Sequence, residues 1–260
     1  MKCVIVAAGS STRLRPLTDA LPKCLLSIGG KTILQRAIEN ILDAHITKIA
    51  VVVGFQAQKI QSFLTRRYPH GNIQCILNPN FASTNNAYSL LLARDFFLES
   101  ESRTKTNDRL LILDSDIVFH PGLLTLLNGN KDENALAVRV DGVHDGEEVR
   151  ASIDKSGNIS RIGKNIALDQ ALRESIGIEL FTHVSARMLF EILEEHVRRG
   201  SGRTGYYESA FQEMIDKGTK IRAVDVGKLP VIEIDSKDDY EYAERVTVPS
   251  IDASLNVRVQ

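Results

Sequence analysis

Hydrophobic residues in the first third of the chain alternate between two spacings. Unbroken apolar runs occur at 3–8 and 49–53, and residues 73–77 form a third run that is apolar except for one glutamine. Such runs are typical of strands buried on both faces. Between them, residues 33–42 and 57–68 carry apolar side chains at helical spacing. Strands that alternate with helices predict a parallel sheet with helices on both faces. The predicted fold class is therefore α/β, Rossmann-like and doubly wound, with a mixed but mostly parallel sheet.

The spacing changes after residue 130. Segments 133–141, 149–154 and 158–162 are short and alternate apolar with polar residues, which predicts antiparallel strands. The intervening 155–158 reads Lys-Ser-Gly-Asn, a composition typical of a hairpin turn. We therefore expect a small antiparallel extension beside the parallel part of the sheet.

Composition narrows the class of protein. The 260 residues are 43% hydrophobic and 25% charged, as in ordinary globular domains. A formal net charge of -1 gives no general attraction to nucleic acid or to an anionic membrane, so we expect neither as a partner. Three cysteines without C-x-x-C spacing favour buried thiols in a reducing compartment. No apolar run reaches spanning length, and Met1-Lys2 leads straight into a strand, so we expect a cytoplasmic protein.

The turn after the first predicted strand has the composition of a phosphate-binding loop. Residues 9–11 are small and leave backbone N–H groups accessible to an anion, while Arg13, Arg15 and Lys23 add positive charge. Small residues after a first strand are also common in doubly wound proteins of every kind. The spacing matches neither the dinucleotide motif nor the P-loop, so the loop predicts a polyphosphate ligand bound in another way.

Eight residues of this segment follow the pattern A-A-G-x-x-x-R-x-x-P-x-T-x-x-x-P-K, which resembles the signature of the nucleotidyltransferases that make NDP-sugars and CDP-alcohols. The eight are Ala7, Ala8, Gly9, Arg13, Pro16, Thr18, Pro22 and Lys23. The resemblance implies the nucleotide-diphospho-sugar transferase-like fold, with Ala7, Ala8, Gly9 and Ser10 around the nucleotide. It departs from the pattern at Ser11, where the family usually has a second glycine.

A second segment, 78–90, leaves a strand through Asn-Pro and offers short polar side chains before an apolar helix that we expect to end near residue 97. Ser83 and Thr84 are residue types that cap helices. The sequence T-N-N-x-Y-S-L also resembles the cytidylyltransferases that activate phosphocholine and aminoalkylphosphonates. By that resemblance Ser83, Thr84, Asn85 and Asn86 read the base, and an asparagine amide has the donor and the acceptor to do so.

Carboxylates follow two predicted strands. Asp114 and Asp116 stand at the exit of an apolar strand, where they are costly without a compensating cation such as Mg²⁺. Aspartates at strand ends also cap turns, and Glu233 and Asp235 also fit the polar face of an edge strand. By resemblance Asp116 and Asp235 are the metal ligands, Glu233 assists, and Asp114 lies beside the nucleotide.

Candidates for the acceptor site lie in the second half. Lys164 follows a glycine, where the resembling families place a lysine on the acceptor's phosphate. Glu174 opens a strand that returns toward the site. Tyr207 and Glu208 begin a helix; they fit packing, or binding of an ammonium group by a ring face and a carboxylate. The basic segment 199–205 fits either a linker or a lid.

The resemblance implies a CTP-dependent nucleotidylyltransferase that uses Mg²⁺ and transfers CMP to a small phosphate or phosphonate. Arg13, Lys23 and Lys164 are its expected catalytic residues. An NDP-sugar pyrophosphorylase, a nucleotide-sensing domain without turnover and a D-x-D glycosyltransferase remain alternatives. We expect one domain at 1–246, with a nucleotide-binding half at 1–130 and an acceptor-binding half at 131–246. A homodimer is a further option, with the tail at 247–260 packed on the partner.

Overall fold

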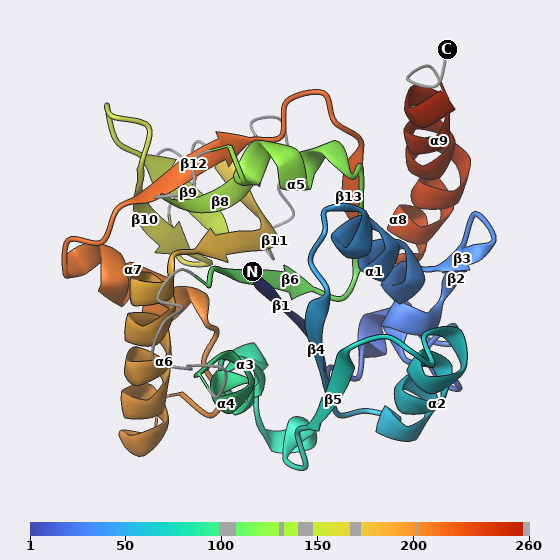
Figure 1. Ribbon diagram of the computed structural model, residues 1–260, viewed down its shortest axis with the longest axis horizontal. Helices are drawn as coiled ribbons and strands as arrows, with labels where there is room; N and C mark the ends of the chain where they lie inside the picture. The colour runs from blue at the N-terminus through green and yellow to red at the C-terminus, as the bar shows by residue number, and fades with distance from the viewer. Residues whose placement is uncertain (99–107, 130–132, 140–147, 167–172, 201, 257–260) are drawn as a thin grey trace.

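The computed structural model describes most of the chain (Figure 1). The described residues are 1–98, 108–129, 133–139, 148–166, 173–200 and 202–256. Positions 140 and 141 of one predicted strand, position 201 of the basic segment and the last four residues of the predicted tail lie outside them.

Within the described ranges, a nine-stranded mixed sheet organises the molecule, with two small two-stranded sheets beside it. The large sheet consists of β1 (Lys2–Ala7), β4 (Lys48–Val53), β5 (Ile73–Leu77), β6 (Leu110–Asp114), β8 (Asn134–Arg139), β9 (Arg150–Ile153), β10 (Ile159–Gly163), β11 (Arg173–Phe181) and β12 (Ile221–Asp225). The small sheets pair β2 (Ser27–Ile28) with β3 (Lys31–Thr32), and β7 (Ile117–Phe119) with β13 (Val231–Glu233).

The helices connect these strands. They are α1 (Ile33–Asp43), α2 (Ala57–Arg67), α3 (Asn86–Leu92), α4 (Arg94–Leu98), α5 (Gly122–Leu127), α6 (His183–Arg198), α7 (Glu208–Asp216), α8 (Lys237–Tyr242) and α9 (Val248–Asn256). Short 3-10 turns occupy η1 (Thr12–Leu14), η2 (Lys23–Leu25) and η3 (Phe81–Ser83), and η4 (Ala243–Thr247) is a π-helical turn.

The register of β1 explains why its apolar run shows no alternation. β1 lies between β4 and β6 and is parallel to both. Cys3 and Ile5 face a core shared with α1, α2 and α5. Val4 and Val6 face a second core shared with α3, α4, α6 and α7. Both faces of the strand are therefore buried, and the predicted α/β fold with a parallel core is confirmed.

The second half of the sheet is antiparallel around β11, as its alternating segments predict. β11 runs antiparallel to β6, β8 and β9, and β9 forms a hairpin with β10. Two details differ from the sequence interpretation. β12 joins β8 in parallel, and the helix expected to run to residue 97 is divided at Ala93 into α3 and α4.

The C-terminal helices pack on this chain's own loops. Val248 and Ile251 of α9 are buried with Leu14, Leu26 and Ile28 in a third apolar cluster. The described part of the predicted tail therefore covers the segment that follows β1, while packing on a partner stays a prediction. Among the described helices, none combines the length and the apolar character needed to cross a membrane.

Candidate active site

A cleft of about 1020 Å³ opens where β1 and β6 end. The loops beyond the carboxyl ends of parallel strands are the usual ligand site in such sheets. The cleft is lined by residues that are distant in the sequence. They include Ala7, Ala8 and Gly9 at the end of β1, Asp116 after β6, and Asp235 after β13. Ser10 does not line this cleft, so the structure brings together three of the four small residues expected around the nucleotide.

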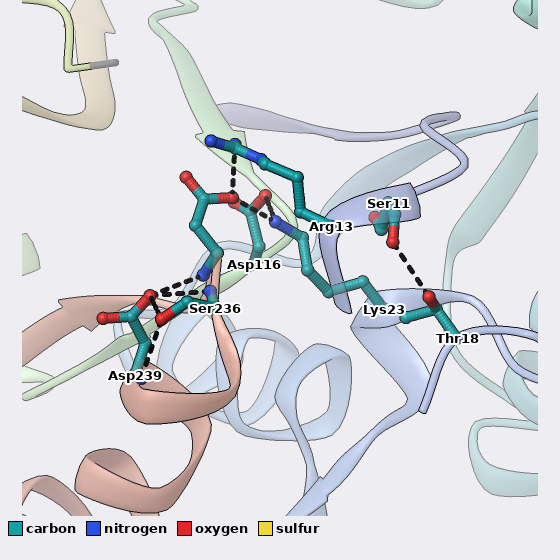
Figure 2. Close-up of polar contacts among 8 residues, drawn as sticks. Ser11, Arg13, Thr18, Lys23, Asp116, Ser236 and Asp239 are labelled. Atoms are coloured by element: carbon teal, nitrogen blue, oxygen red, sulfur yellow. Dashed lines mark hydrogen bonds and ion pairs between the residues drawn. The ribbon is translucent and has the colours of Figure 1, made fainter. Parts of the chain in front are cut away.

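Ser11 shows why this loop favours glycine. Its φ of 48° lies in the left-handed region, which costs a residue with a side chain roughly 1 kcal/mol or more. The backbone is fixed there by Thr18, whose Oγ1 donates a hydrogen bond of 2.8 Å to the carbonyl of Ser11 (Figure 2). Serine therefore keeps the turn that the family pattern makes with glycine.

Lys23 is the centre of the charged part of the cleft. Its Nζ lies 2.6 Å from Oδ2 of Asp116 and 2.8 Å from Oδ1 of Asp235. Arg13 reaches the same Oδ1 atom of Asp235 at 2.9 Å, and Figure 2 shows both cations converging on this point. These distances bring two cations of the segment after β1 together with two aspartates that are distant from them in the sequence.

The protonation states follow from this pairing. Burial alone would lower the pKa of Lys23, but the carboxylates of Asp116 and Asp235 outweigh it and the pKa is raised. Burial opposes ionisation of Asp235, yet Lys23 and Arg13 lower its pKa below the usual value. Both partners are therefore charged at neutral pH.

Three carboxylates have the arrangement of a divalent-metal site. Ligand oxygens of Asp116, Glu233 and Asp235 lie within 4.8 Å of one another. In addition, Oδ1 of Asp116 is buried and has no hydrogen-bond partner in the described part of the chain, and a bound cation would satisfy this oxygen. Oxygen ligands of this kind suit Mg²⁺ bound jointly by one or two carboxylates and substrate phosphates. The residues present therefore fit the metal that the family typically uses.

Backbone pairing brings Asp235 to Asp116. β13 runs antiparallel to β7, and the N–H of Ile234 donates to the carbonyl of Asp116 at 2.9 Å. The next residues begin α8 with a capping box, in which Ser236 and Asp239 each bond the other's backbone. Asp239 also accepts the N–H of Asp235 at 3.1 Å. The capping box therefore also fixes the backbone of the candidate metal ligand.

The loop before α3 uses its polar side chains internally. Thr84 donates to the carbonyl of Asn80 and accepts from Asn78, at 2.9 and 3.0 Å. Asn85 is the N-cap of α3, a position the sequence interpretation considered for Ser83 or Thr84. Ser83 is exposed and does not line the cleft. Thr84, Asn85 and Asn86 do line it, and their predicted reading of the base stays untested.

The far end of the cleft collects the residues expected at the acceptor. Lys164, Glu174 and Glu208 line it, and Nζ of Lys164 lies 4.5 Å from the centre of the Tyr206 ring. Tyr207, by contrast, is fully buried and does not line the cleft. Its hydroxyl donates 2.8 Å to Oδ2 of Asp114, so the structure gives this tyrosine a packing role.

Acidic groups behind this end carry unusual pKa values. Burial, followed by the charges of Asp114 and Glu208, raises the pKa of Glu179 well above its usual range. Burial also raises the pKa of Glu208 to about 7, although its own backbone N–H, Lys164 and Asn86 oppose the shift. Burial also raises the pKa of Asp114, and the negative charges of Asp116 and Glu208 raise it further.

Several lining residues were not found from the sequence. They include Phe81, Ser89, Arg139, Glu148 and Tyr206. Arg139 stands at the end of β8, and only the strand register shows that it faces Glu174 of β11. The Tyr-Tyr-Glu sequence indicated an aromatic ring at the cleft, but the ring that lines the cleft belongs to Tyr206 and not to Tyr207.

Known proteins resemble this chain along most of its length. It is 26% identical to the CTP:phosphoglutamine cytidylyltransferase of Campylobacter jejuni, over 87% of this chain and 92% of that protein. It is 24% identical to the CMP-5'-(3-aminopropyl)phosphonate synthase of Streptomyces rubellomurinus, over 94% of this chain but 38% of that longer protein.

Solved structures and a family pattern agree with the fold. The CTP:phosphocholine cytidylyltransferase of Streptococcus pneumoniae superposes with a TM-score of 0.76, at 22% identity, covering 94% of this chain and 98% of that one. The inositol-1-phosphate CTP transferase of T. maritima gives 0.75 at 18% identity, covering 94% and 95%. The family description "Nucleotidyl transferase" matches residues 2–151. The chain therefore belongs to the nucleotidyl transferase family of enzymes, which transfer a nucleotidyl group from an NTP to a phosphorylated acceptor.

Proposed function

We propose that this enzyme is a CTP-dependent cytidylyltransferase that transfers CMP to a small phosphate or phosphonate and releases pyrophosphate. The observation that carries the proposal is the position of Lys23, held between Asp116 and Asp235 in the cleft. Thr84 and Lys164 line the same cleft as Lys23. A nucleotide bound near Thr84 and an acceptor bound near Lys164 would share this cleft with Lys23.

Cytosine as the base is supported by the relatives. The names of the Campylobacter jejuni and Streptomyces rubellomurinus proteins specify CTP or a CMP product. A 2-aminoethylphosphonate cytidylyltransferase of Lancefieldella rimae is 25% identical over 82% of this chain and 78% of that protein. The acceptors in these names differ, but each is a compact molecule that carries phosphate or phosphonate.

The proposed reaction is a direct in-line displacement. An oxygen of the acceptor's phosphate or phosphonate attacks the α-phosphorus of CTP, the new P–O bond forms, and the bond to the β-phosphate breaks with release of pyrophosphate. Arg13 holds the β- and γ-phosphates, Lys23 bridges the attacking oxygen and the α-phosphate, and Lys164 holds the acceptor. Positioning and neutralisation of charge supply the rate enhancement, without a covalent enzyme intermediate.

Asp116 and Asp235 would hold a Mg²⁺ ion, with Glu233 beside them. When bound, the ion supplies charge neutralisation at the α-phosphate. Lys23 already neutralises these two carboxylates in the structure, so the pair can stay ionised before the nucleotide binds. This explains why two acidic side chains face each other in a cleft that we propose receives a triphosphate.

A panel of substrates tests the proposal. Purified enzyme with Mg²⁺ is offered CTP, UTP, dTTP, ATP or GTP, each with phosphocholine, 2-aminoethylphosphonate or glucose 1-phosphate, and pyrophosphate release is measured. We expect the fastest release with CTP and one of the first two acceptors. Faster release with dTTP or UTP and the sugar phosphate would identify an NDP-sugar pyrophosphorylase instead. Nucleotide binding without pyrophosphate release would identify a sensing domain.

A further inference from the structure

Asn86 lines the cleft. It is the first residue of α3 and belongs to the loop expected to read the base. Its side chain, however, faces the other substrate's site. Oδ1 accepts the backbone N–H of Tyr207 at 3.0 Å. The side chain also lowers the pKa of the Glu208 carboxyl by favouring its charged form. Because Oδ1 is an acceptor, this effect comes from the donor group of the amide, Nδ2.

The segment that Asn86 contacts is attached to α3 at further points. The N–H of Asn85 donates to the carbonyl of Arg203 at 2.8 Å, and Nδ2 of Asn85 reaches the carbonyl of Thr204 at 3.5 Å. On its other side, Tyr207 is fixed by its hydroxyl bond to Asp114. Residues 203–208 are therefore positioned by the base-side loop and by the end of β6.

Glu208 is the member of this segment with capacity left for a ligand. Its side chain lines the cleft and is only 6% exposed. Oε2 is buried and has no hydrogen-bond partner among the described residues. A buried carboxylate oxygen without a donor is unfavourable, so a ligand group that donates a hydrogen bond would be bound there. Lys164 contributes a neighbouring positive charge, which suits the acceptor's phosphate.

We propose that Asn86 is a positioning residue of the acceptor site and does not read the base. By holding Glu208 and the backbone of Tyr207, it presents Oε2 of Glu208 to a hydrogen-bond donor on the acceptor substrate. This rests on the proposed function, because it takes the far end of the cleft as the acceptor's. It changes the role expected for Asn86 and gives Glu208 a defined orientation.

Asn86→Asp is the sharpest variant. It is isosteric, keeps an oxygen for the N–H of Tyr207, and replaces the donor toward Glu208 with a second acceptor. An acidic residue also suits the first turn of α3, so the fold is preserved. Asn80→Asp is the matched control, since it adds the same charge to an exposed residue of the same loop that does not line the cleft.

The readout separates the two substrates. Binding of CTP with Mg²⁺ is titrated calorimetrically without acceptor, and kinetics are measured with phosphocholine or 2-aminoethylphosphonate, whichever the wild-type enzyme turns over faster. We expect Asn86→Asp to leave the CTP dissociation constant within twofold and to raise the KM of the acceptor at least tenfold, with a smaller change in kcat. Asn80→Asp should change neither. A mere loss of structure would weaken both substrates together.

Glu208→Gln provides an independent arm, because it alters the same contact without touching α3. It should also raise the acceptor's KM, and the double variant Asn86→Asp/Glu208→Gln should lose less than the product of the two single losses. If the loss in the double variant instead equals the product of the two single losses, Asn86 and Glu208 act independently and a shared role is contradicted.

Two results would overturn the proposal about Asn86. One is a CTP dissociation constant at least tenfold weaker in Asn86→Asp, and the other is an unchanged acceptor KM. Failure of the proposed function is distinguishable, since the wild-type enzyme would then release no pyrophosphate from CTP. In that case the titration, with whichever of CTP, UTP, ATP or GTP binds most tightly, still decides whether Asn86 contacts the base.

Discussion

The ammonium group of Lys23 lies 2.6 Å from Oδ2 of Asp116. The lysine closes the loop that follows the first strand, whereas the aspartate follows the sixth. Taken alone, the segment with Lys23 could be an ordinary polar turn, and Asp116 could only cap the end of its strand. Their contact is what makes the two segments one site.

Removing the lysine should abolish turnover without unfolding the enzyme. In Lys23→Ala we expect kcat to fall by at least about 10²-fold, the loss typical when one charge-stabilising donor is removed. Pyrophosphate release measures the effect, and far-UV circular dichroism checks the fold. Lys31→Ala is the matched control, because Lys31 pairs with Glu39 away from the cleft. Wild-type turnover in Lys23→Ala would refute the assignment.

Mg²⁺ should stabilise the folded enzyme through the carboxylate pair. At about 100 times its Kd, a bound ion adds about 2.7 kcal/mol, which raises Tm by roughly 5–10 °C for a chain of this size. Differential scanning fluorimetry with and without the ion measures this shift. Asp116→Asn and Asp235→Asn should lose it, and the exposed Asp252→Asn should keep it. An equal shift in all variants would place the ion elsewhere.

Glu179 should make stability depend on pH. It is fully buried, and neither carboxyl oxygen has a partner among the described residues. Its folded-state pKa is raised above the usual 4.5, so above that value the folded state retains a proton that the unfolded state has lost. Its contribution to stability is therefore highest at low pH and falls as pH rises from about 4.5 toward the raised pKa.

Glu179→Gln should remove this dependence. Denaturant unfolding at pH 5 and pH 8 measures it, and we expect the variant's advantage over the wild type to be larger at pH 8. Glu191→Gln, on the exposed side of α6, is the control. An advantage that is larger at pH 5 would contradict the assigned sign.

Tyr207→Phe should destabilise the protein, because it removes the hydroxyl that donates a hydrogen bond to the buried Oδ2 of Asp114 and puts no other donor in its place. Leaving such a group without its bond costs about 1–3 kcal/mol. Thermal unfolding measures the loss. Tyr206→Phe, which alters an exposed tyrosine, should leave Tm within about 1 °C. Equal effects of the two substitutions would contradict the packing role of Tyr207.

Local patterns predicted the parts of this protein that are decided locally. Cys3 to Ala7 form a buried strand because both faces of β1 meet apolar helices, and β9 and β10 form a hairpin on either side of the Lys-Ser-Gly-Asn turn. The meeting of Lys23, Asp116 and Asp235 could be predicted only with the family resemblance, since no local rule joins positions so far apart.

Other features depend on geometry that the sequence does not encode locally. The parallel pairing of β12 with β8 is set by how the chain returns after α7. The choice of Tyr206 over Tyr207 at the cleft follows from where α7 begins, since a change of one position turns a side chain from the core to the surface. The bonding of Asn86 to Tyr207 joins residues 121 positions apart.

The short pairing of β13 with β7 has a consequence for biosynthesis. Asp235 lies 212 positions after Lys23, so a nascent chain can complete most of its large sheet while its charge cluster still lacks an essential member. The proposed metal site is therefore complete only after the three-residue strand β13 and the residues that follow it have been synthesised.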